Sequence, residues 1–369
     1  MTDTRTTPNL LAPATVGGLR LANRLVMAPM TRNRATAEGV PTALMATYYA
    51  QRATAGLIVA EATTPNAVGR TYPNTTGVHD GAQVAGWRRV TEAVRAAGGG
   101  PMFLQIQHGG RVGHPDTSGH TPLAPSPIAL PELLHTPAGK RPAPVPREMT
   151  PHDIGATVAD FAAAARNAVA AGFDGVEVHS ANGYLLHQFL SPNTNHRTDA
   201  WGGGVANRIR FTVAVTEAVA AAIGPRRTGL RISPGRAVNG IDEGDDTGAL
   251  YPALVSALAG HGLAYLHVGF AEPGSAVYRD IREQWPGALI ANPLLPADRL
   301  PADGGRHAAE LLLAAGADLI ALGRPFLANP DLVARLRTGA PVNPVRDQYL
   351  MYVGGATGYT DYPFHPPVA

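Results

Sequence analysis

The sequence predicts an α/β fold: a single (β/α)8 barrel, or TIM barrel, formed by residues 1–369. Eight short apolar runs alternate along the chain with eight amphipathic stretches. The apolar runs are continuous, which is typical of strands in a parallel sheet that is covered on both faces. No linker separates the units, and barrels of this type reach this length as one domain.

The predicted strands follow one another at the spacing of a repeated strand–helix unit. They are residues 24–30, 56–63, 101–108, 175–179, 228–234, 263–269, 288–293 and 317–323. The amphipathic stretches between them include residues 82–98, 151–172, 205–224 and 307–316.

Several of these stretches carry helix start and stop signals. Thr150 precedes Pro151 and Asp153, which gives an N-cap residue, a proline in the first position and an acid in the first turn. A glycine, which readily adopts the left-handed conformation, stands at the end of four stretches. These residues are Gly98, Gly172, Gly224 and Gly316.

Two segments interrupt the repeat. Residues 109–150 separate the third strand from its helix, and the part up to Glu148 contains nine prolines. A loop of this length inside a compact domain is usually a lid or a binding loop. A structural cover over one barrel end is equally consistent with the sequence. A second insertion, near residues 294–303, follows the seventh strand.

The composition excludes several classes of function. The 30 Lys and Arg residues nearly balance the 28 Asp and Glu residues, which argues against nucleic acid or an anionic membrane as a partner. The absence of cysteine excludes disulfides, thiolate metal sites and a Cys nucleophile. With no signal peptide and no membrane-length apolar run, we expect a cytoplasmic monomer or homodimer.

The turn HSANGY, residues 179–184, directly follows the fourth predicted strand. In this type of barrel, catalytic groups lie at the carboxyl ends of the strands. Two neutral donors, His179 and Asn182, can polarise one oxygen atom, and the phenol of Tyr184 can deliver a proton. These groups suit the reduction of an activated C=C bond, provided that another group supplies hydride.

A charged residue, Arg231, interrupts the apolar fifth strand. Charges are almost never buried without a partner, so a carboxylate or an electron-rich ligand must face this guanidinium. Gly304-Gly305 before the seventh helix and Gly323-Arg324 after the eighth strand match the usual phosphate site of this barrel.

Other polar residues support different interpretations. The histidines do not place two ligands on one helix face, so no metal site is predicted. Glu61 and Glu177 could form a glycosidase carboxylate pair, although a mid-strand residue such as Glu177 more often serves packing or an ion pair. The acidic run at residues 242–246 is expected to be a solvated loop.

The chain resembles the Old Yellow Enzyme family of flavin-dependent ene-reductases in a series of motifs that extends from about Asn23 to Pro363. They are residues 23–31 (NRLVMAPMT), 61–63 (EAT), Gln105 with 110–112 (GRV), 179–184 (HSANGY), 191–192 (SP), 195–199 (NHRTD), 201–203 (WGG), 207–208 (NR), 323–326 (GRPF), 329–332 (NPDL) and 358–363 (GYTDYP).

The resemblance implies that FMN is bound non-covalently at the carboxyl face of the barrel. The residues that would contact its ring are Pro29, Met30, Thr31, Ala62 and Gln105, with Thr31 near flavin O4. Arg231 would face N1 and C2=O, where negative charge gathers on reduction. Gly304, Gly305, Gly323 and Arg324 would hold the phosphate. Thr31, in place of a cysteine, corresponds to the Thr-bearing branch of the family.

The resemblance also implies a reaction in two halves. NAD(P)H, with NADPH favoured, reduces FMN, and an α,β-unsaturated carbonyl compound then enters the same site. His179 and Asn182 hydrogen-bond its oxygen. Hydride passes from FMN N5 to Cβ, and Tyr184 protonates Cα from the opposite face. Tyr352 and Gln107 would line the substrate pocket, and Gln107, where many relatives carry Trp, makes that pocket more polar.

Three alternatives remain at this stage. A biosynthetic flavin-dependent reductase or isomerase would act on one specific enal or enone. Tyr184 favours net reduction, because family members that isomerise tend to lack this residue. A cofactor-free barrel hydrolase would use Glu61 and Glu177. A non-catalytic binding barrel would leave Arg231 and the 179–184 turn unexplained.

Overall fold

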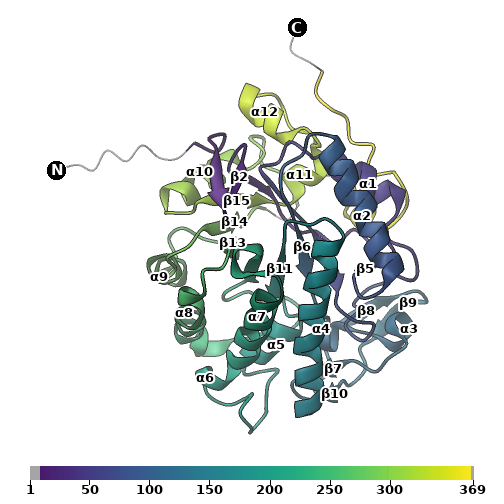
Figure 1. The fold of residues 1–369 in the computed structure, drawn as a ribbon, viewed down its shortest axis with the longest axis vertical. Helices are drawn as coiled ribbons and strands as arrows, with labels where there is room; N and C mark the ends of the chain where they lie inside the picture. The colour runs from purple at the N-terminus through teal and green to yellow at the C-terminus, as the bar shows by residue number, and fades with distance from the viewer. Residues whose placement is uncertain (1–8, 297, 367–369) are drawn as a thin grey trace, which may run out of the picture.

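The computed structural model describes residues 9–296 and 298–366, and it contains the predicted barrel (Figure 1). Eight parallel strands form a closed ring, in which β15 pairs with β3. They are β3 (Leu25–Met27), β4 (Leu57–Thr64), β6 (Met102–Ile106), β11 (Gly175–Ser180), β12 (Thr228–Ile232), β13 (Tyr265–Ala271), β14 (Leu289–Pro293) and β15 (Leu319–Leu322). All eight predicted strands are therefore confirmed.

Helices surround the ring of strands (Figure 1). They are α1 (Ala43–Ala50), α2 (Gly81–Ala96), α4 (Pro151–Ala170), α5 (Leu185–Leu190), α6 (Val205–Arg208), α7 (Arg210–Ile223), α8 (Thr247–Leu258), α9 (Ala276–Gln284), α10 (Arg306–Ala314), α11 (Arg324–Ala328) and α12 (Leu332–Thr338). The predicted helix at 205–224 is divided at Ile209 into α6 and α7. Across the described ranges, no helix combines the length and the apolar character that crossing a membrane requires.

The predicted helix signals have the expected geometry. Thr150 and Asp153 form a reciprocal capping box at the start of α4, with Pro151 in the first turn. The four glycines that were expected to end helices all have positive φ values, between 74° and 94°. Gly224, however, has a ψ of 141° and does not adopt the expected left-handed helical conformation. Local sequence therefore sets these helix ends.

The amino-terminal half of the barrel interior is apolar. Its cluster includes Val26, Phe103 and Tyr265. The hairpin of β1 (Ala14–Val16) and β2 (Leu19–Leu21) packs against this cluster and closes that end of the barrel. A larger apolar cluster lies between the strands and the helices. The polar interior residues are thus confined to the carboxyl half, where the site was predicted.

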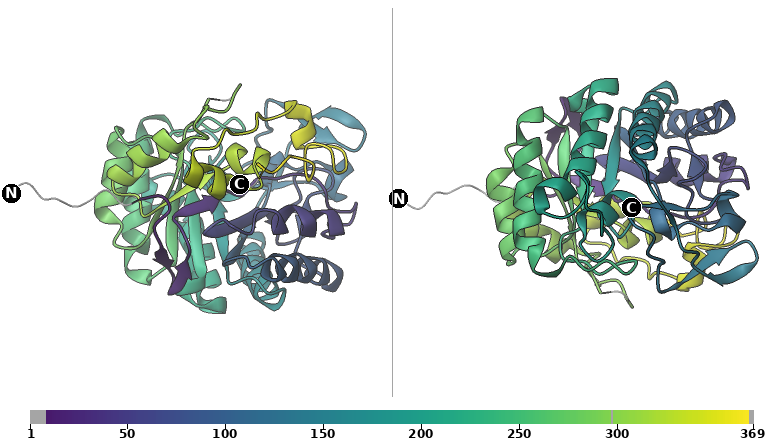
Figure 2. Two further views of the ribbon diagram at one scale, coloured as in Figure 1. Left: turned by 90° about the horizontal axis from the view of Figure 1, so that it is seen from above. Right: turned by 90° about the horizontal axis from the view of Figure 1, so that it is seen from below.

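The 109–150 segment, predicted as a lid or loop insertion, contains short elements of its own. They are η1 (Gly110–Val112), α3 (Pro115–Ser118), the parallel pair β7 (Leu123–Ala124) and β10 (Arg147–Glu148), and the hairpin β8 (Leu133–Thr136) and β9 (Gly139–Pro142). In both views of Figure 2 this hairpin lies beside the carboxyl-terminal segment, drawn in yellow. Its function as a lid stays a prediction.

Candidate active site

A buried polar network crosses the barrel above the apolar cluster. Gln105 Nε2 donates to Glu177 Oε1 at 2.7 Å, and His267 Nδ1 lies 2.8 Å from Glu177 Oε2. Arg231 contacts His267 Nε2 and donates from Nη2 to Asn292 Oδ1 at 3.0 Å. The prediction that Arg231 is buried is confirmed, since it is 5% exposed. Among the described residues, no carboxylate contacts it directly, because its side-chain partners are His267 and Asn292, and the predicted electron-rich ligand stays a prediction. Its partner is a histidine that is itself bonded to a carboxylate.

One arrangement of protons satisfies this network. The Glu177 carboxylate can only accept, so His267 carries its proton on Nδ1 and accepts from Arg231 at Nε2. Burial, and after it Arg231, lowers the pKa of His267 to about 4, so the ring is neutral at pH 7. Burial alone would raise the pKa of Glu177, but His267 and Arg231 together bring it below its usual value. Arg231 is therefore a fixed cation, separated from its counter-ion by an imidazole ring.

The end of β11 places one of the predicted donors next to this cation. His179 is the register neighbour of Arg231. Burial, and after it Arg231, holds the pKa of His179 well below its usual range, so the ring is neutral. Within the described residues, buried His179 Nδ1, Asn182 Oδ1 and Gln107 Oε1 have no hydrogen-bond partner. These three atoms lie on the segments predicted to face the substrate and are free to bind a polar ligand.

Tyr184 begins α5 and points its hydroxyl at another phenol. The hydroxyls of Tyr184 and Tyr72 lie 3.3 Å apart, and the Tyr184 ring lies 5.3 Å from the His179 ring. Burial first, and Tyr72 next, raise the pKa of Tyr184 well above its usual value. The phenol therefore keeps its proton over the physiological range and can donate it.

The ends of β3, β4 and β15 carry the residues that were predicted to contact a flavin ring. Pro29, Met30 and Thr31 follow β3 and are half-buried, and Ala62 lies within β4. A Cβ atom at Gly323 would lie 3.3 Å from Met30 Sδ, so the two strand ends approach closely there. Ala62 and Gly323 are small residues at these strand ends, and contact of this region with a flavin ring stays a prediction.

The predicted phosphate residues form contacts within the chain. Gly304 N donates to Pro301 O at 2.9 Å, and Gly305 N donates to Asp303 Oδ1 at 2.9 Å. Arg324 donates to the carbonyl oxygens of the insertion after β14, including that of Leu295 at 3.2 Å. Phosphate binding by Gly304 and Gly305 stays a prediction, and it would require Asp303 to release an amide. Ala297, within this insertion, lies outside the described residues.

Tyr352 belongs to the carboxyl-terminal segment and is 46% exposed. It lies close enough to Tyr72 and Tyr184 to raise the pKa of both phenols. Its segment is anchored by Arg32 and Arg34, which come just after Thr31. Their guanidinium groups donate to the carbonyl oxygens of Leu350, Met351, Val353 and Gly358 at 2.6–2.9 Å.

The structure separates the two carboxylates of the hydrolase hypothesis. The register of β4 shifts between Ala60 and Thr63, and the Glu61 carboxylate accepts from Tyr49 Oη, on α1, at 3.1 Å. Burial raises the pKa of Glu61 to about 7. Glu177 belongs to the network inside the barrel, so the two residues do not face one substrate. The ion pair expected for Glu177 is not formed, because its partners are the amide of Gln105 and the neutral ring of His267.

The prediction of a solvated acidic loop at 242–246 is wrong for one residue. Glu243 is 4% exposed and lies 2.7 Å from His187 Nε2, while Asp242 and Asp245 are exposed.

Two further residues of the site were not predicted. His267 interrupts an apolar strand as Arg231 does, and that pattern could have identified it. Tyr72 lies in a loop, where no sequence pattern distinguishes it.

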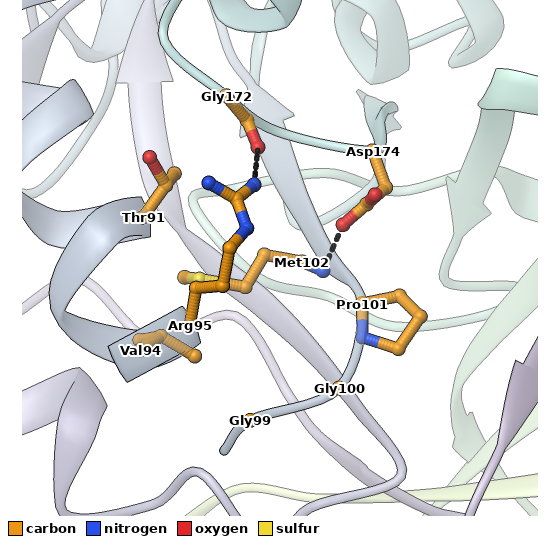
Figure 3. Close-up of a pocket in the computed structure, with 9 residues that line it drawn as sticks. All are labelled: Thr91, Val94, Arg95, Gly99, Gly100, Pro101, Met102, Gly172 and Asp174. Carbon is orange, nitrogen blue, oxygen red and sulfur yellow. Dashed lines mark hydrogen bonds between the residues drawn. The ribbon is translucent and has the colours of Figure 1, made fainter. Parts of the chain in front are cut away.

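A depression at the opposite end of the barrel has no comparable chemistry (Figure 3). Figure 3 shows that its polar groups bind each other: Arg95 Nη2 donates to Gly172 O at 3.4 Å, and Met102 N donates to Asp174 Oδ2 at 2.9 Å. These residues lie at the amino-terminal ends of β6 and β11. The carboxyl end of the barrel is therefore the candidate active site.

Comparison with known proteins agrees with this assignment. Residues 9–343 match the NADH:flavin oxidoreductase / NADH oxidase family. A probable flavin mononucleotide-dependent alkene reductase of Leishmania infantum is 42% identical, over 96% of this chain and 97% of that protein. The old yellow enzyme homologue of Zymomonas mobilis superposes with a TM-score of 0.90 at 39% identity, covering 96% and 99% of the two chains.

Morphinone reductase, in a complex with tetrahydroNAD, also has a TM-score of 0.90, at 40% identity and with 97% and 98% of the chains covered. Both the family match and the coverage of these relatives extend over nearly the whole barrel. The chain therefore belongs to the NADH:flavin oxidoreductase / NADH oxidase family, within its old yellow enzyme group.

Proposed function

We propose that the protein is an NAD(P)H-dependent, FMN-containing ene-reductase that reduces the C=C bond of α,β-unsaturated carbonyl compounds. One observation carries this proposal: the turn after β11 presents a neutral imidazole, an amide and a protonated phenol together, beside the buried cation Arg231. The names of the relatives, an alkene reductase and morphinone reductase, agree with it.

The residues at the carboxyl end of the barrel fit FMN. Arg231 supplies a buried cation for the pyrimidine edge of the ring, and the small residues Ala62 and Gly323 lie at strand ends. The ring contacts would come from Pro29, Met30, Thr31, Ala62 and Gln105. The phosphate would be held by Gly323 and Arg324, with Gly304 and Gly305 as further candidates.

Each residue of the turn has a separate task in the proposed reaction. When bound, FMN supplies the hydride that NAD(P)H provides and that the β-carbon of the substrate receives. His179 and Asn182 donate hydrogen bonds to the substrate oxygen, where negative charge develops. Tyr184 gives its proton to the α-carbon. Gln107 and Tyr352 line the substrate pocket, and the polar Gln107 favours substrates with an additional hydrogen-bonding group.

We expect purified protein to contain FMN that is not covalently attached. The bound flavin should absorb near ~450 nm, and denaturation should release it into the supernatant. Colourless protein that takes up no added FMN would contradict the proposed function. Flavin that remains on the denatured chain would contradict only the non-covalent attachment.

We expect Arg231→Met to lower the reduction potential of the bound flavin. A charge-assisted contact of about 1.5–3 kcal/mol to the reduced ring corresponds to about 30–65 mV for a two-electron couple. Arg231→Lys keeps the charge and is the matched control, which should retain most of the potential. If Arg231→Met leaves both the potential and the FMN affinity unchanged, Arg231 serves only the Glu177–His267 network.

Three finer predictions accompany this proposal. NADPH is favoured over NADH, the protein acts in the cytoplasm, and it is a monomer or a homodimer. Steady-state reduction of a panel of small enones with each nicotinamide, under anaerobic conditions, tests the first of these together with the substrate class.

A further inference from the structure

We infer that His187 and Glu243 are positioning residues, which hold the turn of Asn182 and Tyr184 through a single tautomer of the His187 ring. Neither residue was assigned to the site by the sequence. The inference rests on the proposed function, because it concerns how the donors of that site are fixed in place. His187 lies on α5, one turn after Tyr184, and Glu243 comes from the loop before α8.

The turn has an unusual backbone that needs external support. Asn182 and Gly183 both have positive φ values, of 56° and 76°. Asn tolerates this left-handed conformation better than most residues. At Gly183, a Cβ atom would lie 2.3 Å from Val238 O, so no side chain fits there. Two consecutive left-handed residues cannot form regular hydrogen bonds, so other groups must satisfy their backbone atoms.

Side chains bind all four backbone polar groups of these two residues. Asn182 N donates to Ser233 Oγ at 2.9 Å, Asn182 O accepts from Asn239 Nδ2 at 2.8 Å, Gly183 N donates to His187 Nδ1 at 3.1 Å, and Gly183 O accepts from Gln188 Nε2 at 2.8 Å. Within the described residues, Asn182 Oδ1 is left without a partner, while the Tyr184 hydroxyl contacts only side chains, including that of Tyr72. Of these four side chains, His187 is the one that also contacts a buried carboxylate, that of Glu243.

The hydrogen bonds fix where the His187 ring carries its proton. Nδ1 accepts from the Gly183 amide, so it has no proton of its own. Nε2 lies 2.7 Å from Glu243 Oε1 and therefore donates to the carboxylate. Both side chains are at most 2% exposed. A proton on Nδ1 would instead face the N–H of Gly183, donor against donor.

Glu243 is held in turn by three further donors. Its Oε2 accepts from Gly235 N at 2.9 Å and from Thr247 Oγ1 at 2.9 Å, and its Oε1 also accepts from Tyr251 Oη. Burial would raise the pKa of Glu243, but the bonds from His187 and Tyr251 bring it below its usual value. The carboxylate thus stays ionised, and it selects the Nε2–H tautomer of His187.

Two substitutions of His187 test its two hydrogen bonds, to Gly183 and to Glu243, one at a time. In His187→Asn, the side-chain oxygen occupies the place of Nδ1 and can still accept from Gly183, but the side chain is too short to reach Glu243. In His187→Gln, the amide reaches Glu243 but leaves Gly183 N–H without an acceptor. Each variant loses one buried hydrogen bond, so a purely structural role would affect both equally.

The variants are compared by titrating the flavin-loaded protein with a simple phenol, which binds through the donors His179 and Asn182, and by thermal unfolding. We expect His187→Asn to bind the phenol within about threefold of the wild-type affinity and His187→Gln to bind it about tenfold or more weakly, while their melting temperatures fall by similar amounts. Equal phenol affinities in the two variants, or the reverse order, would overturn the inference.

Neutron diffraction of the wild-type protein gives a second test that needs no variant. We expect deuterium on His187 Nε2 and none on Nδ1. Deuterium on Nδ1 would overturn the inference even if both variants failed to fold. The two proposals also fail in distinguishable ways. Wild-type protein that binds FMN but reduces no enone would contradict the proposed function, whereas the position of the His187 proton would still be measured.

Discussion

Tyr184→Phe should slow the reduction of a simple cyclic enone by about 10²–10⁴, the usual share of a positioned general acid. Reduction of the enzyme by NAD(P)H should be unchanged, because that step needs no proton on the alkene. The measurement is stopped-flow kinetics of the two half-reactions. Phenylalanine keeps the ring that packs 5.3 Å from His179, so the variant removes the proton and little else.

Tyr72→Phe is the matched control for this experiment. Its hydroxyl lies 3.3 Å from that of Tyr184, so losing it removes a hydrogen bond to the donor but not the donor itself. We expect a loss of less than tenfold, in keeping with one ordinary hydrogen bond. If Tyr184→Phe reduces the enone at the wild-type rate while chemistry limits turnover, Tyr184 is not the proton donor. If Tyr72→Phe alone gives the full loss, Tyr72 is the donor.

Replacing both His179 and Asn182 with alanine should abolish binding of the carbonyl substrate in its reactive orientation. Removing one donor to a developing oxyanion typically costs ~10²–10³ in rate, and here both donors to one oxygen are lost. We expect a phenol to present its oxygen to the same two donors, so the long-wavelength band of the phenol complex should disappear. Absorption titration tests binding, and the oxidative half-reaction tests the rate.

Gln107→Ala is the control for the double variant. Gln107 Oε1 is also buried without a partner within the described residues, but we place it in the pocket wall and not at the oxyanion. The phenol band should survive this substitution, while the preference among substituted enones changes. A double variant that still binds phenol with the same band would show that the donor pair has been assigned to the wrong residues.

The barrel could be predicted because its signal is local. Continuous apolar runs predicted all eight strands, and Thr150 with its neighbours predicted the start of α4. Arg231 could be identified for the same reason: a charge in an apolar strand must be buried, and its sequence neighbours are sufficient to show this. The break between helices α6 and α7 at Ile209, by contrast, has no marker such as proline or glycine in the sequence.

The supporting contacts of the site could not be predicted, because they join residues that are far apart in the chain. Glu243 has acidic neighbours that are exposed, and it differs from them only through His187, which is 56 residues away. Tyr72 contacts Tyr184 through its hydroxyl, although the two residues are 112 positions apart in the sequence. In both cases the role of the side chain depends on tertiary packing. The residues that neighbour it in the sequence do not reveal that packing.

The anchoring of the carboxyl-terminal segment has a consequence for how this enzyme can evolve. Arg32 and Arg34 bind only backbone carbonyl oxygens in residues 350–358, and every amino acid supplies such an oxygen. These hydrogen bonds therefore do not depend on the side chains of residues 350–353, although Arg32 and Arg34 also lie over the Tyr359 ring, 4.9 and 4.8 Å from its centre. Tyr352, at 46% exposure, should therefore be exchangeable without releasing the segment. If it lines the pocket as proposed, we expect the pocket wall to diversify toward new substrates while its scaffold stays fixed.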